Sequence, residues 1–413
     1  MSFQQGLSGL NAASKSLDVI GNNVANANTV GFKQSEAEFA DVFANSLNGS
    51  GGTQVGIGTT VRAISQQFAQ GNITVTNNPL DIAINGKGFY RLSNNGAISY
   101  SRNGQFQLDK DGYIVNSDGM HLTGYAANAA GVLDTSAPTD LRISSRDATP
   151  KQTSGVDAVL NLDSRETPPA GAFDYLDPST YNSSTSLAAF DSLGNAHTLS
   201  LYFVRAAGNS WNVYTAADGT GAPAPVAPST TPVVAGTLNF NADGSLNTAT
   251  STMPNLTAIP VTTGANALNV GIDFTGTTQF GSAFGVNSLG QDGYASGRLA
   301  GLSVGGDGTI QGRYTNGQTS TLGQITIANF SNPQHLQPMG SNSWAETAES
   351  GSPLIGAPGS GTLGVLQSAA VEDSNVDLTA ELVNMITAQR VYQANAQSIK
   401  TQDAVLQTLV NLR

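Results

Sequence analysis

Both ends of the chain carry an apolar pattern of the same period, and this pattern limits the possible folds more than any other feature. From Val365 to the C-terminus the sequence contains no glycine and no proline. Large apolar residues recur in this stretch at steps of seven: Leu378, Met385, Tyr392, Ile399 and Leu406. Such a repeat is typical of a helix that buries a narrow stripe against a partner helix. It predicts a helix over residues 377–412, about 50 Å long at roughly 1.5 Å per residue.

A shorter pattern of the same kind occupies residues 2–28. Its larger apolar positions are Phe3, Leu10, Leu17 and Val24, and the companion positions are Gly6, Ala13, Ile20 and Ala27. Because most of the companion residues are small, a partner helix can approach this side closely. We therefore expect the N- and C-terminal helices to pair as a coiled coil, with the two heptad stripes as an assembly seam.

An asparagine-rich run from Asn22 to Lys33 ends the N-terminal pattern. Asparagine side chains compete for backbone hydrogen bonds, which weakens a helix, and Gly31 can adopt the left-handed conformation that ends one. Beyond this run, Phe39, Val42 and Phe43 fit a short second helix. Residues 47–60 contain many glycines and predict an irregular loop.

The middle of the chain has the pattern of β-structure. Asn-Gly and Asp-Gly pairs, which favour tight hairpin turns, recur between short apolar runs from about Ile73 onward. Leu199, Leu201 and Phe203 alternate on one face and return as Trp211, Val213 and Thr215, which predicts a half-buried hairpin.

The expected fold class is therefore α+β and mainly β. Two antiparallel β-domains are inserted in series between the paired terminal helices. Residues 73–150 and 290–363 form a discontinuous inner β-domain, and residues 151–289 form an inserted outer β-domain. Residues 1–72 and 364–413 form the terminal helical assembly domain with its linker.

Composition excludes several classes of function. The formal net charge is -12 and no basic cluster occurs, so we expect neither nucleic acid nor an anionic membrane as a partner. Cysteine is absent, which removes disulfides, thiolate chemistry and Cys-zinc sites. No window approaches the roughly 18 apolar residues of a membrane span. The first residues also lack the pattern of a secretory signal, so we expect no cleaved signal peptide.

Two short patterns have the form of enzyme motifs. Residues 301–305 match G-x-S-x-G around Ser303, but a turn rather than a helix is expected after them. Residues 359–364 match G-x-G-x-x-G, but they follow a proline-containing linker rather than a strand. His121, His197 and His335 are isolated from one another in sequence. We therefore expect no enzyme activity and no catalytic, cofactor-binding or metal-binding residues.

The two terminal helices carry little apolar surface for their length. Burying one large apolar side chain contributes about 1.5–3 kcal/mol, whereas ordering the backbone costs ~1–2 kcal/mol per residue. We therefore expect termini that are mobile in the single chain and ordered in an assembly.

Motifs at both ends and in the first β-segment resemble the bacterial flagellar rod and hook protein family. The motif after the N-terminal heptads is carried by Asn26, Asn28, Thr29, Gly31, Phe32 and Lys33. The runs 78–84, 88–90 and 100–106 resemble the β-domain of that family, and the runs 374–378 and 388–395 resemble its C-terminal helix. Residues 190–197 with the strand after them are similar to the outer domain of hook proteins, which the shorter rod proteins lack.

The resemblance implies a structural subunit that self-assembles into a curved helical tube. The tube would act as a flexible universal joint that transmits motor torque from rod to filament. Implied partners are other copies of the chain, the rod, hook cap and hook-filament junction proteins, and the flagellar export apparatus. The implied location is the extracellular hook, reached without a cleaved signal peptide and without membrane insertion. A distal rod protein and a secreted β-rich adhesin stay open as alternatives.

Overall fold

The computed structural model describes residues 2–42, 56–128, 130–144, 146–217, 220–221, 234–259 and 264–411. These residues form two compact units. The first unit contains residues 1–145, 301–313 and 319–413, and the second contains residues 146–300 and 314–318. Strands predominate in both units, and the two α-helices that the structure describes lie near the two chain ends. The mainly β fold with terminal helices is thus confirmed.

The terminal helices begin and end close to the expected residues. Helix α1 spans Ser2–Ala25 and helix α2 spans Leu378–Asn411. Helix α1 ends three residues earlier than predicted, where the Ala27 and Thr29 amides donate to the carbonyl oxygens of Val24 and Asn26, three positions before them, and no longer follow the helical step of four. Gly31 has the expected left-handed conformation, with φ 73°. Asp377 caps α2 by accepting hydrogen bonds from the amides of Thr379 and Ala380.

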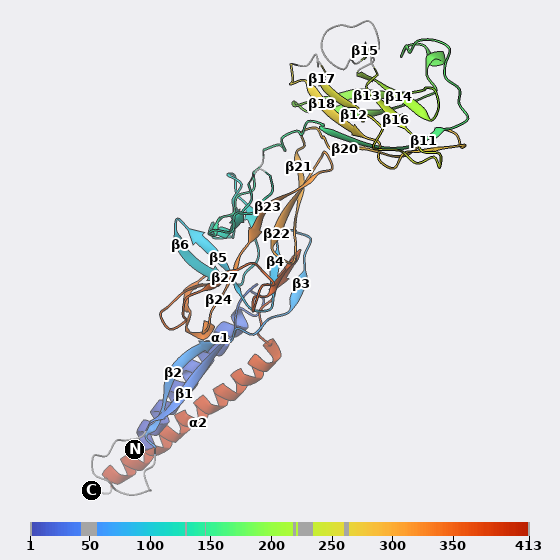
Figure 1. Ribbon diagram of the computed structural model, residues 1–413. Coiled ribbons are helices and arrows are strands. Elements are labelled where there is room, and N and C mark those ends of the chain that lie inside the picture. Colours follow the sequence, from blue (N-terminus) through green and yellow to red (C-terminus); the bar gives the residue numbers. More distant parts are fainter. Residues whose placement is uncertain are drawn as a thin grey trace. The chain divides into compact units, whose positions relative to one another are not determined.

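The predicted short second helix is wrong. Residues Ser35–Val42 form strand β1, which pairs antiparallel with β2 (Gly58–Gln66). This hairpin contacts α1 along its length (Figure 1). The pairing partner is supplied from beyond residue 56, so the strand could not be recognised from the apolar spacing of residues 39–43 alone. Phe43 and residues 47–55 of the predicted loop lie outside the described residues.

The first unit contains one large sheet with strand order β21-β22-β23-β9-β5-β6-β26-β25, and β28 with β4 and β29 with β3 form separate two-stranded sheets of the same unit. Its first strands are β3 (Ile73–Val75), β4 (Ile82–Asn85), β5 (Phe89–Asn94), β6 (Ala97–Ser101), β7 (Gln107–Leu108), β8 (Ile114–Val115), β9 (His121–Ala126) and β10 (Thr139–Asp140). Its later strands are β21 (Leu299–Val304), β22 (Thr309–Tyr314), β23 (Thr319–Ile325), β24 (Ile327–Asn329), β25 (Gln337–Gly340), β26 (Ser343–Ala345), β27 (Leu354–Gly356), β28 (Val365–Ser368) and β29 (Ala370–Glu372). A short 3-10 helix, η2, spans Pro333–His335.

Strands from distant parts of the sequence pair within this unit. Strand β23 pairs with β9, β24 with β5 and β26 with β6. Strands β28 and β29 pair with β4 and β3. Residues 299–372 therefore add strands to those of residues 73–126. The division of this unit into a terminal domain and an inner β-domain stays a prediction.

The second unit has two sheets that share one core. Its elements are β11 (Gly155–Asp163), η1 (Pro178–Thr180), β12 (Ser183–Phe190), β13 (Ala196–Arg205), β14 (Ser210–Ala217), β15 (Thr220–Gly221), β16 (Gly236–Asn239), β17 (Asn255–Ile259), β18 (Leu268–Asp273), β19 (Thr278–Phe280) and β20 (Gly285–Gln291). The predicted hairpin is confirmed, because β13 pairs antiparallel with β14 and buries Phe203 and Trp211. The core also includes Leu160 and other residues of β11.

Two pairings of β11 depart from the purely antiparallel prediction. Strand β11 runs parallel to β18 and β19 and antiparallel to β20. Two parallel neighbours need a long crossover connection. Here the strands of the other sheet of this unit, β12 to β16, lie between β11 and β18 in the sequence. Local turn signals indicate adjacent antiparallel strands, so they could not reveal this pairing.

Candidate assembly site

Helices α1 and α2 lie antiparallel and in close contact through the small residues of α1. A Cβ added to Gly6 would lie 2.9 Å from Cγ1 of Ile399, and one added to Gly9 would lie 2.8 Å from Oδ1 of Asn395. Further along α1, Ser16 and Ile20 face the beginning of α2 around Asn384. The side of α1 that contains the small companion positions therefore faces α2. Whether the pair is a regular coiled coil stays a prediction.

The predicted stripe on α1 is not the most buried side of that helix in the single chain. Phe3 is 47% exposed, and Leu10, Leu17 and Val24 are half-buried. The buried residues of α1 are instead Gly6, Ala13, Val19 and Asn23. Glycine and alanine at the contact bring the two backbones together, which leaves the larger side chains toward the flanks of the helix.

The predicted stripe on α2 is divided between two environments. Met385 and Ile399 are half-buried, whereas Leu378, Tyr392 and Leu406 are exposed. Of these five predicted residues, Ile399 lies directly against α1, beside Gly6.

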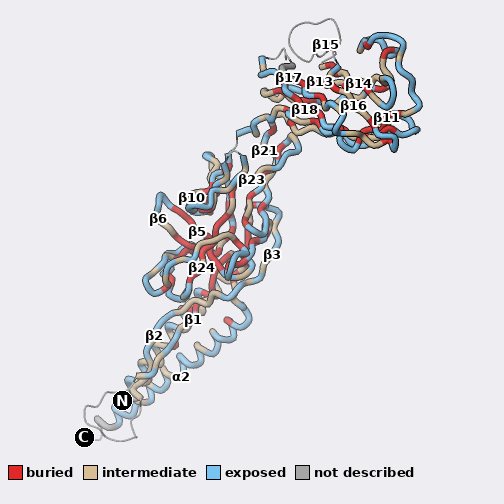
Figure 2. The backbone as a smooth tube through the Cα atoms, in the orientation of Figure 1, coloured by how far each residue is buried: buried red, intermediate tan, exposed pale blue. Residues whose placement is uncertain are grey.

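Helix α2 also exposes apolar side chains outside its seven-residue repeat. Leu382, Val383, Ile386 and Val391 are 45%, 58%, 52% and 47% exposed. Most of α2 is coloured as exposed in Figure 2. Soluble single chains rarely expose contiguous apolar patches of this kind unless the patch is an interaction site. We call Leu378, Leu382, Val383 and Ile386 the α2 patch. Leu378, Leu382 and Ile386 follow one another at steps of four, and Val383 precedes Ile386 by three.

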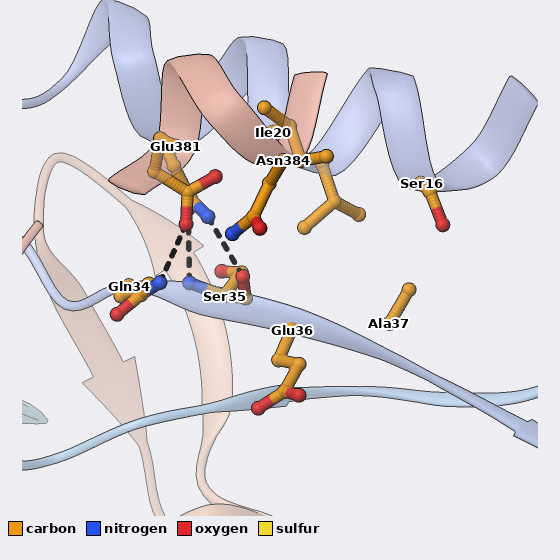
Figure 3. Close-up of a pocket in the computed structure, with 10 residues that line it drawn as sticks. Ser16, Ile20, Gln34, Ser35, Glu36, Ala37, Glu381 and Asn384 are labelled. Carbon is orange, nitrogen blue, oxygen red and sulfur yellow. Dashed lines mark hydrogen bonds between the residues drawn. The ribbon is translucent and has the colours of Figure 1, made fainter. Parts of the chain in front are cut away.

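A set of polar contacts connects the start of α2 to the end of α1 and to β1. The side chain of Asn23 donates to the Ser35 carbonyl oxygen at 2.8 Å and accepts from the Ser35 amide at 2.9 Å. The side chain of Gln34 donates to Oε1 of Glu381 at 2.6 Å, and the Gln34 amide donates to Oδ1 of Asn375 at 2.8 Å. Figure 3 shows Glu381 beside Gln34 and Ser35. These contacts fix α1, β1 and α2 to one another at one end.

Two cavities lie along the contact between α1 and α2. The first, of about 360 Å³, is shown in Figure 3 and is lined by Ser16, Val19, Ile20, Asn23, Gln34, Ser35, Glu36, Ala37, Glu381 and Asn384. The second, of about 460 Å³, is lined by Gly9, Ala12, Ala13, Ser16, Ile20, Phe39, Thr59, Asn384, Thr387, Ala388, Val391 and Asn395. Packing between α1 and α2 is therefore incomplete in the single chain.

The motif after α1 ends at a buried cluster of charges. The Lys33 ammonium lies 2.6 Å from Oε1 of Glu372 and donates to the Ala69 carbonyl oxygen at 2.7 Å. Nε of Arg102 lies 3.1 Å from Oε2 of Glu372. The Gly71 amide donates to Oε1 of Glu372 at 2.9 Å. The exposed side-chain fractions of Lys33, Arg102 and Glu372 are 0%, 4% and 0%. We call these three residues the charge cluster.

Burial is the largest influence on the Lys33 ammonium, and it lowers the pKa of this group. The Glu372 carboxylate raises the pKa of Lys33 and the Arg102 guanidinium lowers it further, with a net decrease. Burial destabilises a charged amine, so a lowered pKa is the expected direction for this site.

The other residues of the motif surround the same place. Phe32 and Gly31 are buried, Asn26 and Thr29 are half-buried, and Asn28 is exposed. The Gly31 amide donates to the Glu372 carbonyl oxygen at 2.8 Å. A Cβ added to Gly31 would lie 2.6 Å from the backbone nitrogen of Asn103, so this position needs glycine for close approach as well as for its positive φ.

Sequence reasoning missed Arg102, Glu372, Asn23 and Glu381. A usable signal did exist for Glu372. Charged residues make up only 11% of the chain, and Glu372 directly follows the apolar pair Ala370 and Val371. A charge at the end of a buried strand in a chain with so few charges indicates an ion pair, but it does not identify the partner.

The residues considered as catalytic or metal-binding candidates lie on a strand or beside a single carboxylate. Ser303 is an exposed residue of β21, and the chain turns from it into β22 rather than into a helix. His121, His197 and His335 each lie beside a different carboxylate, those of Asp140, Asp191 and Glu349. Within the described ranges, no group of three or more residues could hold a metal ion, and no described helix is long and apolar enough to span a membrane.

Models of four flagellar protein families match successive parts of the chain. Residues 3–33 match the model described as "Flagella basal body rod protein", and residues 83–149 match "Flagellar hook protein FlgE/F/G D1 domain". Residues 161–294 match "Flagellar basal body protein FlaE D2 domain", and residues 367–412 match "Flagellar basal body rod FlgEFG protein C-terminal".

Curated relatives match over the whole chain. The flagellar hook protein FlgE of Escherichia coli (strain K12) is 43% identical over 418 residues, with 100% of both chains covered. Those of Rhizobium meliloti and Borreliella burgdorferi are 34% and 33% identical, each over 100% of this chain and 98% and 99% of the relative.

A solved structure has a related fold. The crystal structure of Helicobacter pylori flagellar hook protein FlgE2 matches with a TM-score of 0.50 and 14% identity, covering 73% of this chain and 99% of that one. At this level of identity the likeness concerns the fold alone.

Proposed function

The chain belongs to the flagellar hook protein FlgE family and is a structural subunit of the bacterial flagellar hook, and we propose that its terminal helices are the elements through which it polymerises. The observation that carries this proposal is the α2 patch, which stays exposed in the single chain. A second copy of the chain is the natural partner, because the family polymerises. A distal rod protein and an adhesin are not favoured, because the relatives named above that cover the whole chain are hook proteins.

The energetics favour a cooperative polymer over a simple dimer. The four side chains of the α2 patch are 45–58% exposed. Covering the exposed half of four side chains would contribute on the order of 3–6 kcal/mol per subunit, at about 1.5–3 kcal/mol for each complete burial. Association costs an estimated 4–15 kcal/mol in lost freedom of motion. One such contact is therefore too weak, whereas several contacts per subunit in a helical lattice can exceed this cost.

Within this proposal the two predicted heptad stripes take different roles. Met385 and Ile399 stabilise the pair of α1 and α2 within one chain. Leu378, Tyr392 and Leu406, together with Phe3 of α1, contact neighbouring copies. The tube that results is curved and acts as a flexible universal joint that transmits motor torque from rod to filament. The role requires no catalytic group and no cofactor.

The same proposal covers the remaining partners and the location. Subunits at the two ends of the tube contact the rod, the hook cap and the hook-filament junction proteins. The flagellar export apparatus delivers the chain to the extracellular hook. Low charge on most of the surface supports contacts between copies that can shift during bending, because hydrogen bonds mediated by water exchange at little net cost.

Replacing Ile386 by aspartate tests this function. Ile386 is 52% exposed, so Ile386→Asp leaves the packing of the single chain largely intact. It places a charge where a neighbouring copy would bury an apolar side chain, which is strongly unfavourable. We expect Ile386→Asp to abolish tubes seen by electron microscopy, while circular dichroism of the single chain stays close to that of the wild type.

Gln397→Asp is the matched control, because Gln397 is an exposed polar residue of the same helix. It introduces the same charge outside the α2 patch and should polymerise like the wild type. Normal tubes from Ile386→Asp at the wild-type concentration would contradict the proposed role of α2.

A further inference from the structure

The charge cluster lies where three elements leave the rest of the first unit. Lys33 precedes the first residue of β1 by two positions, and Ala69 follows the last residue of β2 by three. Glu372 ends β29, six positions before the first residue of α2. The chain therefore enters the β1–β2 hairpin, leaves it, and enters α2 within a few residues of a single buried carboxylate.

Stability alone does not account for the composition of the cluster. It holds two cations, Lys33 and Arg102, and only one carboxylate, that of Glu372. A buried pair of opposite charges is often no more stabilising than apolar residues of the same volume. A second buried cation without its own carboxylate adds a further desolvation penalty. The lowered pKa of Lys33 has the sign that this penalty predicts.

Arg102 has enough partners without Lys33. Its guanidinium donates to the Gly88 carbonyl oxygen at 2.7 Å and to the Gly86 carbonyl oxygen at 3.0 Å, besides its contact with Glu372. The Arg102–Glu372 pair could therefore persist as a neutral unit. Lys33 is therefore the member of the charge cluster whose charge can be removed without leaving an unpaired buried charge.

The contacts of Lys33 fix the relative position of the chain segments that meet at the cluster. Its ammonium contacts the Ala69 carbonyl oxygen and the Glu372 carboxylate at 2.7 and 2.6 Å, and these acceptors belong to segments 303 positions apart in the sequence, 372 minus 69. Apolar side chains tolerate small sliding movements, whereas two short charge-assisted hydrogen bonds restrict both distance and angle. The contact therefore defines one relative position of the segments that precede β1, follow β2 and precede α2.

We propose that Lys33, held by Glu372, is a positioning residue for assembly, which fixes the directions in which α1, the β1–β2 hairpin and α2 leave the buried junction. This inference rests on the proposed function, because it assumes that these elements carry the contacts between copies. A neighbouring copy can engage several surfaces at once only when they are presented in one geometry. If the junction populates several geometries, a smaller fraction of chains is competent to join the polymer.

The variant Lys33→Met in the full chain tests this role. Methionine keeps the length and the apolar stem of lysine but has neither its charge nor its donors. We expect the thermal midpoint of the single chain to fall little or to rise, because the unbalanced buried cation is gone. The concentration left unpolymerised at equilibrium should rise at least about tenfold, the equivalent of about 1.4 kcal/mol. Hydrogen exchange of residues 69–72 and 372–377 should accelerate in the single chain by a similar factor.

Lys15→Met is the matched control, because Lys15 is an exposed lysine of α1 that pairs with Asp18. It should leave polymerisation and hydrogen exchange at their wild-type values. Lys33→Met would overturn the inference in either of two ways. It could polymerise like the wild type with unchanged exchange, or it could lower the thermal midpoint of the single chain in parallel with assembly, as a purely stabilising residue would.

The two readouts separate this inference from the proposed function. If the wild type and Lys15→Met form no tubes, the proposed function fails, whatever Lys33→Met does. Hydrogen exchange in the single chain still decides whether Lys33 fixes the junction. If the wild type forms tubes and Lys33→Met forms them equally well, only the role of Lys33 is wrong.

Discussion

At the scale of single residues, Glu372 is a buried charge with contacts to several separate segments of the first unit. Its carboxylate contacts Lys33, Arg102 and the Gly71 amide, and its carbonyl oxygen accepts from the Gly31 amide. It is also the register partner of Ile73 in the pairing of β29 with β3. One side chain thus joins the end of the N-terminal motif, the segment after β2 and the segment before α2.

Neutralising Glu372 should be strongly destabilising. Glu372→Gln keeps the shape of the side chain but leaves two buried cations without a carboxylate, and breaking a buried ion pair in this way costs about 3–5 kcal/mol. Urea unfolding at neutral pH should show a fall of that size in the free energy of unfolding. Glu346→Gln, which alters a carboxylate that accepts from the Tyr100 hydroxyl at 3.0 Å, should cost about 0.5–1.5 kcal/mol. Equal effects from the two variants would argue against a special role for the cluster.

At the scale of elements, the contact between α1 and α2 depends on the absence of side chains. Gly6 and Gly9 face α2 directly, whereas a Cβ added to Gly21 of the same helix would meet nothing within 4 Å. Helix propensity alone would favour alanine at all three positions. The first two glycines are therefore explained by the approach of α2, and Gly21 has no packing reason within the described part of the single chain.

This difference predicts opposite results for two chemically identical substitutions. Gly21→Ala should raise the free energy of unfolding by about 0.5–1 kcal/mol, the difference in helix propensity. Gly6→Ala should bring no gain or a loss, because its Cβ would lie 2.9 Å from Ile399 and the side chain there would have to move. Chemical denaturation followed by far-ultraviolet circular dichroism measures both. An equal gain from the two variants would mean that α1 and α2 do not pack closely in solution.

Helix α2 also illustrates how a heptad pattern can serve two contacts. Its seven-residue repeat correctly indicates a long helix with a preferred side, since Met385 and Ile399 are half-buried and Ile399 lies against Gly6 of α1. The repeat does not reveal that Leu382, Val383 and Ile386 form a second apolar surface. Periodicity identifies a stripe, but whether one chain or two cover it depends on what else packs nearby.

At the scale of the whole molecule, each compact unit has its own core. The core of the second unit includes Phe203 and Trp211, and a core of the first includes Phe89, Phe330 and Trp344, with edge-to-face ring contacts. Each unit therefore buries its own apolar surface. We expect the two units to unfold as separate cooperative steps when conditions affect them differently.

Acid should act on the second unit through Asp292. Burial raises the pKa of this carboxyl, but hydrogen bonds from the Gly155 and Ser154 amides, the Ser154 hydroxyl and Lys151 outweigh burial and hold the pKa well below 3.8. A carboxyl with a lowered pKa stabilises the fold above its unfolded value, and this contribution is lost as pH falls toward its folded value. The second unit should therefore lose stability as pH falls below about 3.8.

The variant Asp292→Asn measures that contribution. It should lower the stability of the second unit at neutral pH and reduce the additional loss on acidification. The chain has two tryptophans, so a Trp344→Phe background leaves Trp211 as a fluorescent reporter of the second unit. Urea unfolding in that background at a series of pH values gives the stability directly. An unchanged slope of stability against pH in Asp292→Asn would show that this carboxyl is not linked to folding.

Much of the local structure could be predicted from the sequence. Both terminal helices, the turn at Gly31 and the hairpin of Leu199–Thr215 follow from repeats of seven, alternation and turn residues, and the structure contains all of them. These features depend on neighbours within about ten positions, whose propensities and periodicities act together. The assembly role of the helices, which the heptad stripes and the small apolar surface of the helices indicated, stays a proposal.

The features that only the tertiary structure decided all depend on partners far away in the sequence. Residues 35–42 are a strand because of β2, and β11 has parallel neighbours because a second sheet intervenes. Lys33 can be buried because its ammonium pairs with the carboxylate of Glu372, 339 positions later in the sequence. By itself the sequence determined the two terminal helices and several of the turns, since local sterics and hydrogen bonding act over a few residues. It indicated that the small-residue side of α1 meets a partner helix, but it did not determine which charges are buried together, because that depends on surfaces that exist only after the distant segments have come into contact.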